Sequence, residues 1–271
     1  MIMALLPLSP TLRRYDHVLL DLDGCLWVGD EPCAGAADAV TLLRESGRSV
    51  RFLTNDVRHG PEEFVRKLWR LGFQAAVDEV LSVGAAVERL LSRRGDGTAF
   101  VIGTQALVDH VGDAGLRIVN RTPFAPRADV VVVGAHEAFD YEELRIAVQA
   151  VVRGAQLVGA TRDTTFPMPD GSWPATGALL AAVESAAGRT ADIVVGKPEP
   201  GMYAAARETL GPGRVLAVGD RLDVDVAGAR RAGLDSALVL TGTTTRAEAA
   251  VADPRPTHVA ESLAALVLAD D

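Results

Sequence analysis

Two aspartates separated by one residue, Asp21 and Asp23, follow an apolar run near the start of the sequence. The run Val18-Leu19-Leu20 has the pattern of a strand that is buried on both faces, as in parallel sheets. In open α/β sheets, ligands bind beyond the carboxyl ends of such strands. Two carboxylates at that place are costly to bury unless they share a cation. The pair therefore indicates a metal site that contains a nucleophile, although solvated aspartates at a strand end have the same pattern.

Other polar residues that could take part in a reaction follow three further apolar runs. They are Thr54 and Asn55, Lys197, and Asp220 with Asp223 and Asp225 behind it. Parallel strands of one sheet bring their carboxyl ends to one edge. Carboxylates, a hydroxyl, an amide and an ammonium together suit a hard divalent cation and the oxygens of a phosphoryl group. A carboxylate beside Mg²⁺ can attack phosphorus and form an aspartyl-phosphate.

The elements needed to position these groups are predicted by short apolar runs that alternate with amphipathic segments. The first part of the chain predicts strands at 18–20 and 50–53 and helices at 34–45 and 61–71. The last part predicts strands at 193–195, 215–218 and 236–240 and helices at 202–210, 227–232 and 261–268. The middle repeats this alternation without an acid pair, with a helix at 78–91 and a loop at 161–174. We therefore expect parallel strands with right-handed crossovers, and a second α/β domain inserted into the first.

Composition narrows the classes of partner. The chain has 271 residues and a formal net charge of −9, and it has no basic stripe, so we expect no nucleic-acid partner. Its two cysteines, Cys25 and Cys33, form no disulfide framework, which favours a reducing cytoplasmic location. No apolar run approaches the length of a membrane span, so we expect no membrane partner. The GxGxxG and Walker patterns of dinucleotide-binding and P-loop proteins are absent.

The ordered set of motifs resembles the haloacid dehalogenase (HAD) superfamily of phosphatases. The matching stretches are Asp21-Leu22-Asp23-Gly24, Thr54-Asn55, Gly196-Lys197-Pro198 and Gly219-Asp220-Arg221-Leu222-Asp223-Val224-Asp225. The long insert before Lys197 is similar to the class IIA branch, the p-nitrophenylphosphatase type with a type-two cap. The resemblance implies an α/β fold with a Rossmann-like doubly wound parallel sheet core and an inserted α/β cap domain. We expect the core at 1–80 plus 185–271 and the substrate-selecting cap at 81–184.

The resemblance also implies roles for the acidic residues. Asp21 would be the nucleophile and a ligand of Mg²⁺. Asp23 would protonate the leaving oxygen and then activate water, and its main-chain carbonyl would bind the metal. Asp220 would complete the protein ligands of the metal. Asp225 would lie just outside them and fix a metal-bound water or Lys197. We interpret Asp223 as a solvated acid at a helix start.

The other motif residues would hold the phosphate, and three positions depart from the branch. Thr54, Asn55 and Lys197 are the phosphate-binding residues that the resemblance implies. Asp56 stands where a second Asn is usual, either as a loop acid or as a contact to a substrate amine or hydroxyl. Cys25 replaces a common Thr and is expected to be a small buried side chain.

The third departure lies in the expected cap. Arg162 and Asp163 replace a more usual Asn-Pro-Asp pattern in a loop that faces the substrate in this branch. They are candidates for selecting the leaving group, with a surface Arg-Asp pair as the alternative.

These features predict a Mg²⁺-dependent phosphomonoesterase that acts on a small phosphorylated metabolite through an aspartyl-phosphate. Sugar, glycerol, glycolate or pyridoxal phosphates are the expected substrate types, and a homodimer through the cap is implied by the resemblance. A phosphotransferase or mutase would instead pass the phosphoryl group to an acceptor hydroxyl. A non-catalytic metabolite-binding module is the alternative from another class.

Overall fold

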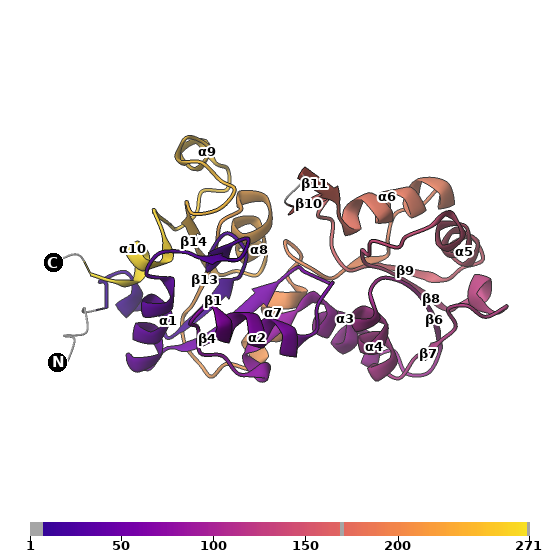
Figure 1. Cartoon of the computed structure of the whole chain (residues 1–271), viewed down its shortest axis with the longest axis horizontal. Coiled ribbons are helices and arrows are strands. Elements are labelled where there is room, and N and C mark those ends of the chain that lie inside the picture. Colours follow the sequence, from indigo (N-terminus) through magenta and orange to yellow (C-terminus); the bar gives the residue numbers. More distant parts are fainter. Residues whose placement is uncertain (1–7, 169–170, 270–271) are drawn as a thin grey trace. The chain divides into compact units, whose positions relative to one another are not determined.

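The computed structural model describes residues 8–168 and 171–269, and its contacts divide the chain into two compact units. We call the first the core unit: residues up to Thr54, Pro61–Leu81, and residues from Lys197 onward. The second, the insert unit, contains Asn55–Gly60 and Ser82–Gly196. Figure 1 labels many of the elements of the two units, which are described separately below.

A six-stranded sheet forms the centre of the core unit, in the order β15-β14-β13-β1-β4-β5. Its strands are β1 (His17–Asp21), β4 (Ser49–Thr54), β5 (Val80–Ser82), β13 (Val215–Gly219), β14 (Asp235–Val239) and β15 (His258–Ala260). The pairings from β15 through to β4 are all parallel. Because β1 has β4 on one side and β13 on the other, the strand order reverses there, and such a switch point is where ligands bind.

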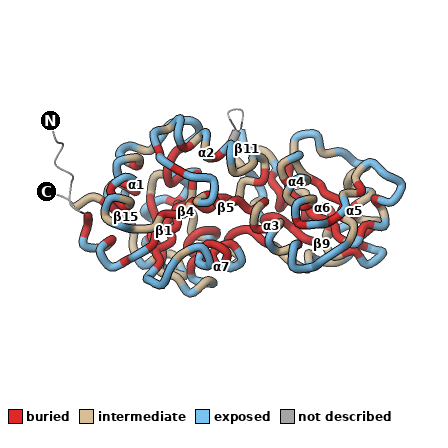
Figure 2. The backbone as a smooth tube through the Cα atoms, turned by 90° about the horizontal axis from the view of Figure 1, so that it is seen from below, coloured by how far each residue is buried: buried red, intermediate tan, exposed pale blue. Residues whose placement is uncertain are grey.

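The helices of the core unit have amphipathic sequences that bury one face. They are α1 (Ala36–Glu45), α2 (Pro61–Arg70), α7 (Gly201–Glu208), α8 (Ala227–Arg231), α9 (Arg246–Val251) and α10 (Leu263–Val267). A short antiparallel hairpin, β2 (Trp27–Val28) and β3 (Glu31–Pro32), follows β1. Leu20, Phe52 and Leu216 from neighbouring strands belong to one hydrophobic cluster. Buried residues, red in Figure 2, lie along β1 and β4, in agreement with the burial patterns of these strands.

The insert unit has its own parallel sheet, in the order β12-β9-β8-β6-β7. Its strands are β6 (Thr98–Ile102), β7 (Arg117–Ile118), β8 (Val130–Val133), β9 (Gln156–Gly159) and β12 (Ile193–Val194). The helices are α3 (Val83–Ser92), α4 (Gln105–Asp113), α5 (Tyr141–Val152) and α6 (Thr176–Ala187). All four valines of β8 are buried, as expected for a strand covered on both faces. The predicted α/β class with a Rossmann-like parallel core is confirmed.

Several local predictions are wrong. The helix predicted at 78–91 is divided, because β5 joins the sheet edge beside β4 and Ser82 then caps α3 by accepting a hydrogen bond from the Ala85 amide. The loop predicted at 161–174 contains an antiparallel hairpin, β10 (Thr165–Met168) and β11 (Gly171–Pro174). The strand predicted at 236–240 is not the last, since β15 pairs beyond it.

The contact-based division also differs from the expected boundary of 81–184. The insert unit ends at Gly196 rather than at residue 184, because α6 runs through that position and β12 pairs with β9. Asn55–Gly60 also belongs to the insert unit by its contacts, although it directly follows β4.

Candidate active site

The carboxyl ends of β1 and β13 carry the central acids of the core unit. Leu20 pairs with Val218 in register, so Asp21 at the end of β1 and Asp220 directly after β13 lie at nearly the same level. One carboxylate oxygen from each of Asp21, Asp220 and Asp225 lies within 4.8 Å of the others. Sheet topology therefore brings together acids that are about 200 positions apart in sequence.

Lys197 joins two of these acids. Its Nζ donates hydrogen bonds of 2.6 Å to Oδ1 of Asp21 and 2.7 Å to Oδ1 of Asp225. The side chain of Lys197 is only 3% exposed. A buried ammonium is stable only when paired and hydrogen-bonded, and the two carboxylates supply both.

Asp220 and Asp225 are fixed by backbone groups. The amide of Thr243 donates to Oδ2 of Asp220 at 2.6 Å, and the amide of Arg221 donates to Oδ2 of Asp225 at 3.1 Å. Arg221 immediately precedes an irregular π-helical turn at Leu222–Val226, which carries Asp225 back toward β13. Both carboxylates are buried, so these amide donors replace lost water contacts.

Two glycines leave room for the Asp220 carboxylate. Gly24 has φ of +76°, and a Cβ there would lie 2.5 Å from Cγ of Asp220. A Cβ on Gly242 would lie 2.1 Å from Oδ2 of the same residue. Any larger side chain at either position would displace the carboxylate, which explains the glycine that directly follows Asp23.

Burial and mutual repulsion change the pKa values of the acids in this group. Burial raises the pKa of Asp21 well above its ordinary value, and nearby Asp225 adds to the rise while Lys197 opposes it. Burial and Asp225 also raise the pKa of Asp220. Burial alone would lower the pKa of Lys197, but the charges of Asp21 and Asp225 outweigh it and hold the pKa well above its usual value.

The donor set fits a hard dication. When all are ionised, three carboxylates and one ammonium leave two negative charges uncompensated. Oxygen ligands in this arrangement suit Mg²⁺ or Ca²⁺, which prefer carboxylates, carbonyls and water. A dication at Asp21 and Asp220 would favour the ionised carboxylates, which burial and then repulsion between the acids disfavour.

The remaining motif residues of the core unit lie as follows. Thr54 ends β4, is buried, and comes one residue after the register partner of Asp21. Asp23 is exposed, and its Oδ1 accepts a hydrogen bond of 2.7 Å from Nε1 of Trp27. Asp223 is largely exposed and pairs with Arg221 at 2.8 Å, which agrees with its interpretation as a solvated acid. Cys25 is buried, as predicted.

Asn55 makes its described contacts in the insert unit. Its Nδ2 donates to Oδ2 of Asp163 at 2.8 Å. A Cβ on Gly196 would lie 2.8 Å from Oδ1 of Asn55, so these two residues are tightly packed. Asp163 therefore holds the amide that directly follows Thr54 along the chain.

Asp56 is engaged by Arg58. The Arg58 guanidinium donates to both oxygens of Asp56, at 2.9 Å and 2.8 Å, and its own amide donates to Oδ1. Burial would raise the pKa of Asp56, but the hydrogen bonds and charge of Arg58 outweigh it and lower the pKa. The guanidinium carbon also lies 4.4 Å from the centroid of the Phe166 ring in the β10–β11 hairpin. The anion at this unusual position is thus neutralised within its own loop.

Arg162 and Asp163, which are adjacent in the sequence, hydrogen-bond to different residues of the insert unit. Arg162 donates to Glu184 of α6, at 2.9 Å and 3.2 Å, while Asp163 accepts from Asn55. The Arg162 hydrogen bonds lower the pKa of Glu184. The two neighbours thus serve different parts of the insert unit.

Sequence reasoning missed the contacts of Trp27, which is buried. It also missed Tyr203, whose hydroxyl donates to the carbonyl of Asp225 at 3.2 Å, and the Thr243 amide. The only sequence signal for Trp27 was its nearness to Asp23, while nothing in the sequence indicated the other two.

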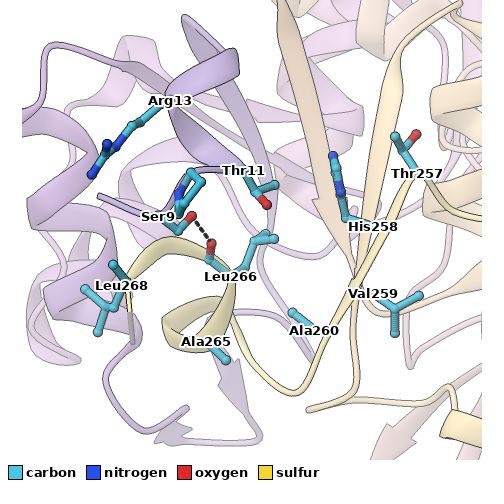
Figure 3. Close-up of a pocket in the computed structure, with 12 residues that line it drawn as sticks. Ser9, Thr11, Arg13, Thr257, His258, Val259, Ala260, Ala265, Leu266 and Leu268 are labelled. Atoms are coloured by element: carbon cyan, nitrogen blue, oxygen red, sulfur yellow. Dashed lines mark hydrogen bonds between the residues drawn. The ribbon is translucent and has the colours of Figure 1, made fainter. Parts of the chain in front are cut away.

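A separate surface pocket of about 660 Å³ lies between the stretch 9–13, β15 and α10 (Figure 3). Ser9 donates to the Leu266 carbonyl at its wall, and Arg13 and His258 are its charged or titratable lining residues. None of the motif acids lines this pocket. In the described part of the chain, no helix has the length and apolar character required to cross a membrane.

Comparisons with known proteins show the family of the chain. A family model for haloacid dehalogenase-like hydrolases matches residues 18–117, and a HAD-hydrolase-like model matches residues 194–266. Chronophin of Rattus norvegicus is 37% identical over 254 residues, covering 89% of this chain and 82% of the relative.

Solved structures extend the similarity to the whole fold. Glycerol phosphate phosphatase from Mycobacterium tuberculosis in complex with magnesium has a TM-score of 0.87 at 33% identity, covering 96% of this chain and 79% of that one. The same enzyme is also known in complex with calcium. The 4-nitrophenylphosphatase of Thermotoga maritima has a TM-score of 0.88 at 30% identity, covering 95% and 98% of the two chains.

The chain belongs to the haloacid dehalogenase-like hydrolase family. Within it, the chain is one of the phosphatases, the enzymes that hydrolyse phosphoric monoesters. The resemblance seen in the sequence motifs is confirmed.

Proposed function

We propose that this phosphatase is Mg²⁺-dependent and hydrolyses a small phosphorylated metabolite through an aspartyl-phosphate on Asp21. The observation that carries the proposal is the buried group in which Lys197 bonds Asp21 and Asp225 while Asp220 lies within 4.8 Å of both. Such a group serves no packing purpose and is costly to bury, so its charges indicate chemistry.

In the first step, a carboxylate oxygen of Asp21 attacks phosphorus and the bond from phosphorus to the leaving oxygen breaks. Asp23 donates its proton to that oxygen, so the product leaves as an alcohol. Lys197 stabilises the ionised form of Asp21 and opposes the effect of burial on its pKa.

In the second step, water attacks phosphorus and the bond from phosphorus to Asp21 breaks. Asp23 accepts the proton from water and thereby returns to its starting state, and inorganic phosphate is released. Thr54 and Asn55 donate to phosphoryl oxygens in both steps.

The Asp21 and Asp220 carboxylates and the main-chain carbonyl of Asp23 would hold Mg²⁺, which would supply positive charge to the phosphoryl oxygens. Asp225 holds Lys197 in place. The magnesium complex of the related glycerol phosphate phosphatase supports this choice of ion.

The substrate class is a small phosphomonoester. The similarity to glycerol phosphate phosphatase favours glycerol phosphate, and sugar, glycolate and pyridoxal phosphates belong to the same class. We propose that Arg162 and Asp163 select the leaving group, and that Asp163 also holds the phosphate-binding amide of Asn55 in position.

The test compares wild type with Asp21→Asn on 4-nitrophenyl phosphate and on a panel of small phosphomonoesters, with Mg²⁺ and with chelator. Asp223→Asn, which changes a largely exposed acid that is not one of the three grouped carboxylates, is the matched control. We expect turnover only with Mg²⁺, its loss in Asp21→Asn, and normal turnover in the control. Turnover by a folded Asp21→Asn variant would contradict the assignment of Asp21 as the nucleophile. Transfer of the phosphoryl group to an added polyol in preference to water would indicate a phosphotransferase.

A further inference from the structure

The indole N–H of Trp27 donates a hydrogen bond of 2.7 Å to Oδ1 of Asp23. We propose that Trp27 is a positioning residue for the proton transfers of Asp23, and that Lys67 holds the Trp27 ring in the required orientation. This inference rests on the proposed function, in which Asp23 is the general acid and base. All three residues belong to the core unit.

The local backbone brings Trp27 to Asp23. The Gly24 amide donates to the carbonyl of Trp27 at 2.7 Å, and the Leu26 amide donates to the carbonyl of Leu22 at 2.8 Å. These bonds close a tight turn that Gly24 permits through its positive φ. Asp23 and Trp27 thus form a bridge across the turn.

The ring of Trp27 is held from several directions. It is 1% exposed, and Phe73 meets it edge to face at a centroid distance of 6.4 Å. Nζ of Lys67, on α2, lies 4.7 Å from the ring centroid and donates to the carbonyl of Gly29 in the β2–β3 turn at 3.0 Å. A cation over the indole face attracts the ring, so α2 and the hairpin fix the direction of the N–H.

This bond gives the two oxygens of Asp23 different tasks. An indole N–H is only a donor, so Oδ1 acts as its acceptor and the transferable proton resides on Oδ2. The leaving oxygen takes the proton from Oδ2 as its bond to phosphorus breaks, and water later returns a proton to Oδ2. Because Asp23 is an exposed side chain, anchoring one oxygen removes rotational freedom from the other.

The experiment uses the dependence of rate on the leaving group. Trp27→Phe retains an aromatic ring but removes the N–H. The parameter kcat/KM reports the steps up to departure of the leaving group, where nitrophenolate needs little protonation and an alkoxide requires it. We expect Trp27→Phe to lower kcat/KM for an alkyl phosphate such as glycerol phosphate by about tenfold or more. For 4-nitrophenyl phosphate we expect a loss of less than about threefold.

Asp23→Asn separates this inference from the proposed function. It should show the same selective loss, larger in size, and adding Trp27→Phe to it should cause no further selective loss. If Asp23→Asn lowers kcat/KM equally for both substrates, Asp23 is not the general acid and that part of the proposed function fails. If Asp23→Asn lowers kcat/KM mainly for the alkyl phosphate but Trp27→Phe lowers it equally for both substrates, the role of Trp27 is overturned. The proposed function then stands.

Lys67 offers a second test that does not alter the indole. Lys67→Met should selectively lower kcat/KM for the alkyl phosphate, and Lys67→Arg should lower it less. Arg70→Met is the control, because Arg70 lies on the same helix and contacts Asp30 of the hairpin at 3.4 Å. An equal effect of Lys67→Met and Arg70→Met on kcat/KM for the alkyl phosphate would contradict a role for the contact between Lys67 and the ring. This comparison still decides the question if Trp27→Phe does not fold.

Discussion

The ammonium of Lys197 donates a hydrogen bond of 2.6 Å to Oδ1 of Asp21, which lies 176 positions earlier in the chain. The insert unit occupies most of the sequence between them, yet both residues belong to the core unit. The bond depends on the tertiary fold, because no local element could bring these residues together.

Removing the ammonium of Lys197 should lower the free energy of unfolding. Lys197→Met leaves Asp21 and Asp225 buried without their shared cation, and breaking a buried pair in this way costs about 3–5 kcal/mol. Chemical denaturation without Mg²⁺ measures the loss, and hydrolysis should be abolished. Arg231→Met, which breaks a half-exposed pair with Glu199, is the control and should cost less than about 1 kcal/mol. Equal losses in the two variants would contradict the importance of the buried pair.

Mg²⁺ should stabilise the wild type against heat. At about 100 times its dissociation constant, an ion that binds only the folded state adds about 2.7 kcal/mol. Asp220→Asn removes a proposed ligand and should lose most of the rise in Tm, whereas Asp223→Asn should keep it. Differential scanning fluorimetry with and without Mg²⁺ measures the shift. A full shift in Asp220→Asn would exclude Asp220 as a ligand.

His258 should make stability depend on pH. Burial, together with the charges of Arg14 and Arg214, lowers the pKa of His258 below its ordinary value of 6.5, although Asp235 opposes this. The folded state then binds fewer protons than the unfolded state, so stability falls as pH falls through 6.5 toward the folded pKa.

Replacement by glutamine removes this titration. From about pH 7.5 to about pH 5.5, Tm should therefore fall less in His258→Gln than in wild type. Thermal unfolding at several pH values measures the difference, and parallel curves would refute the prediction.

Asp163 should act through Asn55. If its carboxylate only positions the Asn55 amide, Asp163→Ala and Asn55→Ala should lower kcat/KM for 4-nitrophenyl phosphate to a similar degree. Their double variant should then lose little more than either single variant, because the two changes remove one interaction. Fully additive losses in this cycle would show that the two residues act independently.

The parallel core and its acids could be predicted because strand ends are marked in the sequence. Buried runs such as Val18–Leu20 and Val215–Val218 specify strands, and parallel pairing then places Asp21 and Asp220 at one edge. The motif order added Lys197. The expectation that Lys197 follows a strand of the same sheet as the acids is wrong, because β12 pairs with β9 in the insert unit.

Side-chain partners could not be predicted in the same way. Asp163 bonds Asn55 and Arg162 bonds Glu184, although the sequence makes the adjacent Arg and Asp equally suited to each other. The hydrogen bond from Trp27 to Asp23 depends on a positive φ at Gly24 and on packing by Phe73 and Lys67. The short strands β5 and β15 are specified mainly by their neighbours in the sheet, which a local pattern does not contain.

The most direct test of the central claim is to trap the phosphoryl group on the enzyme. Wild type is mixed with 4-nitrophenyl phosphate and Mg²⁺, quenched in acid during turnover, digested and analysed by mass spectrometry. We predict one added phosphoryl group on the peptide that contains Asp21, and none on that peptide in Asp21→Asn. A phosphoryl group on a different residue, or its presence in Asp21→Asn, would contradict the assignment of Asp21 as the nucleophile.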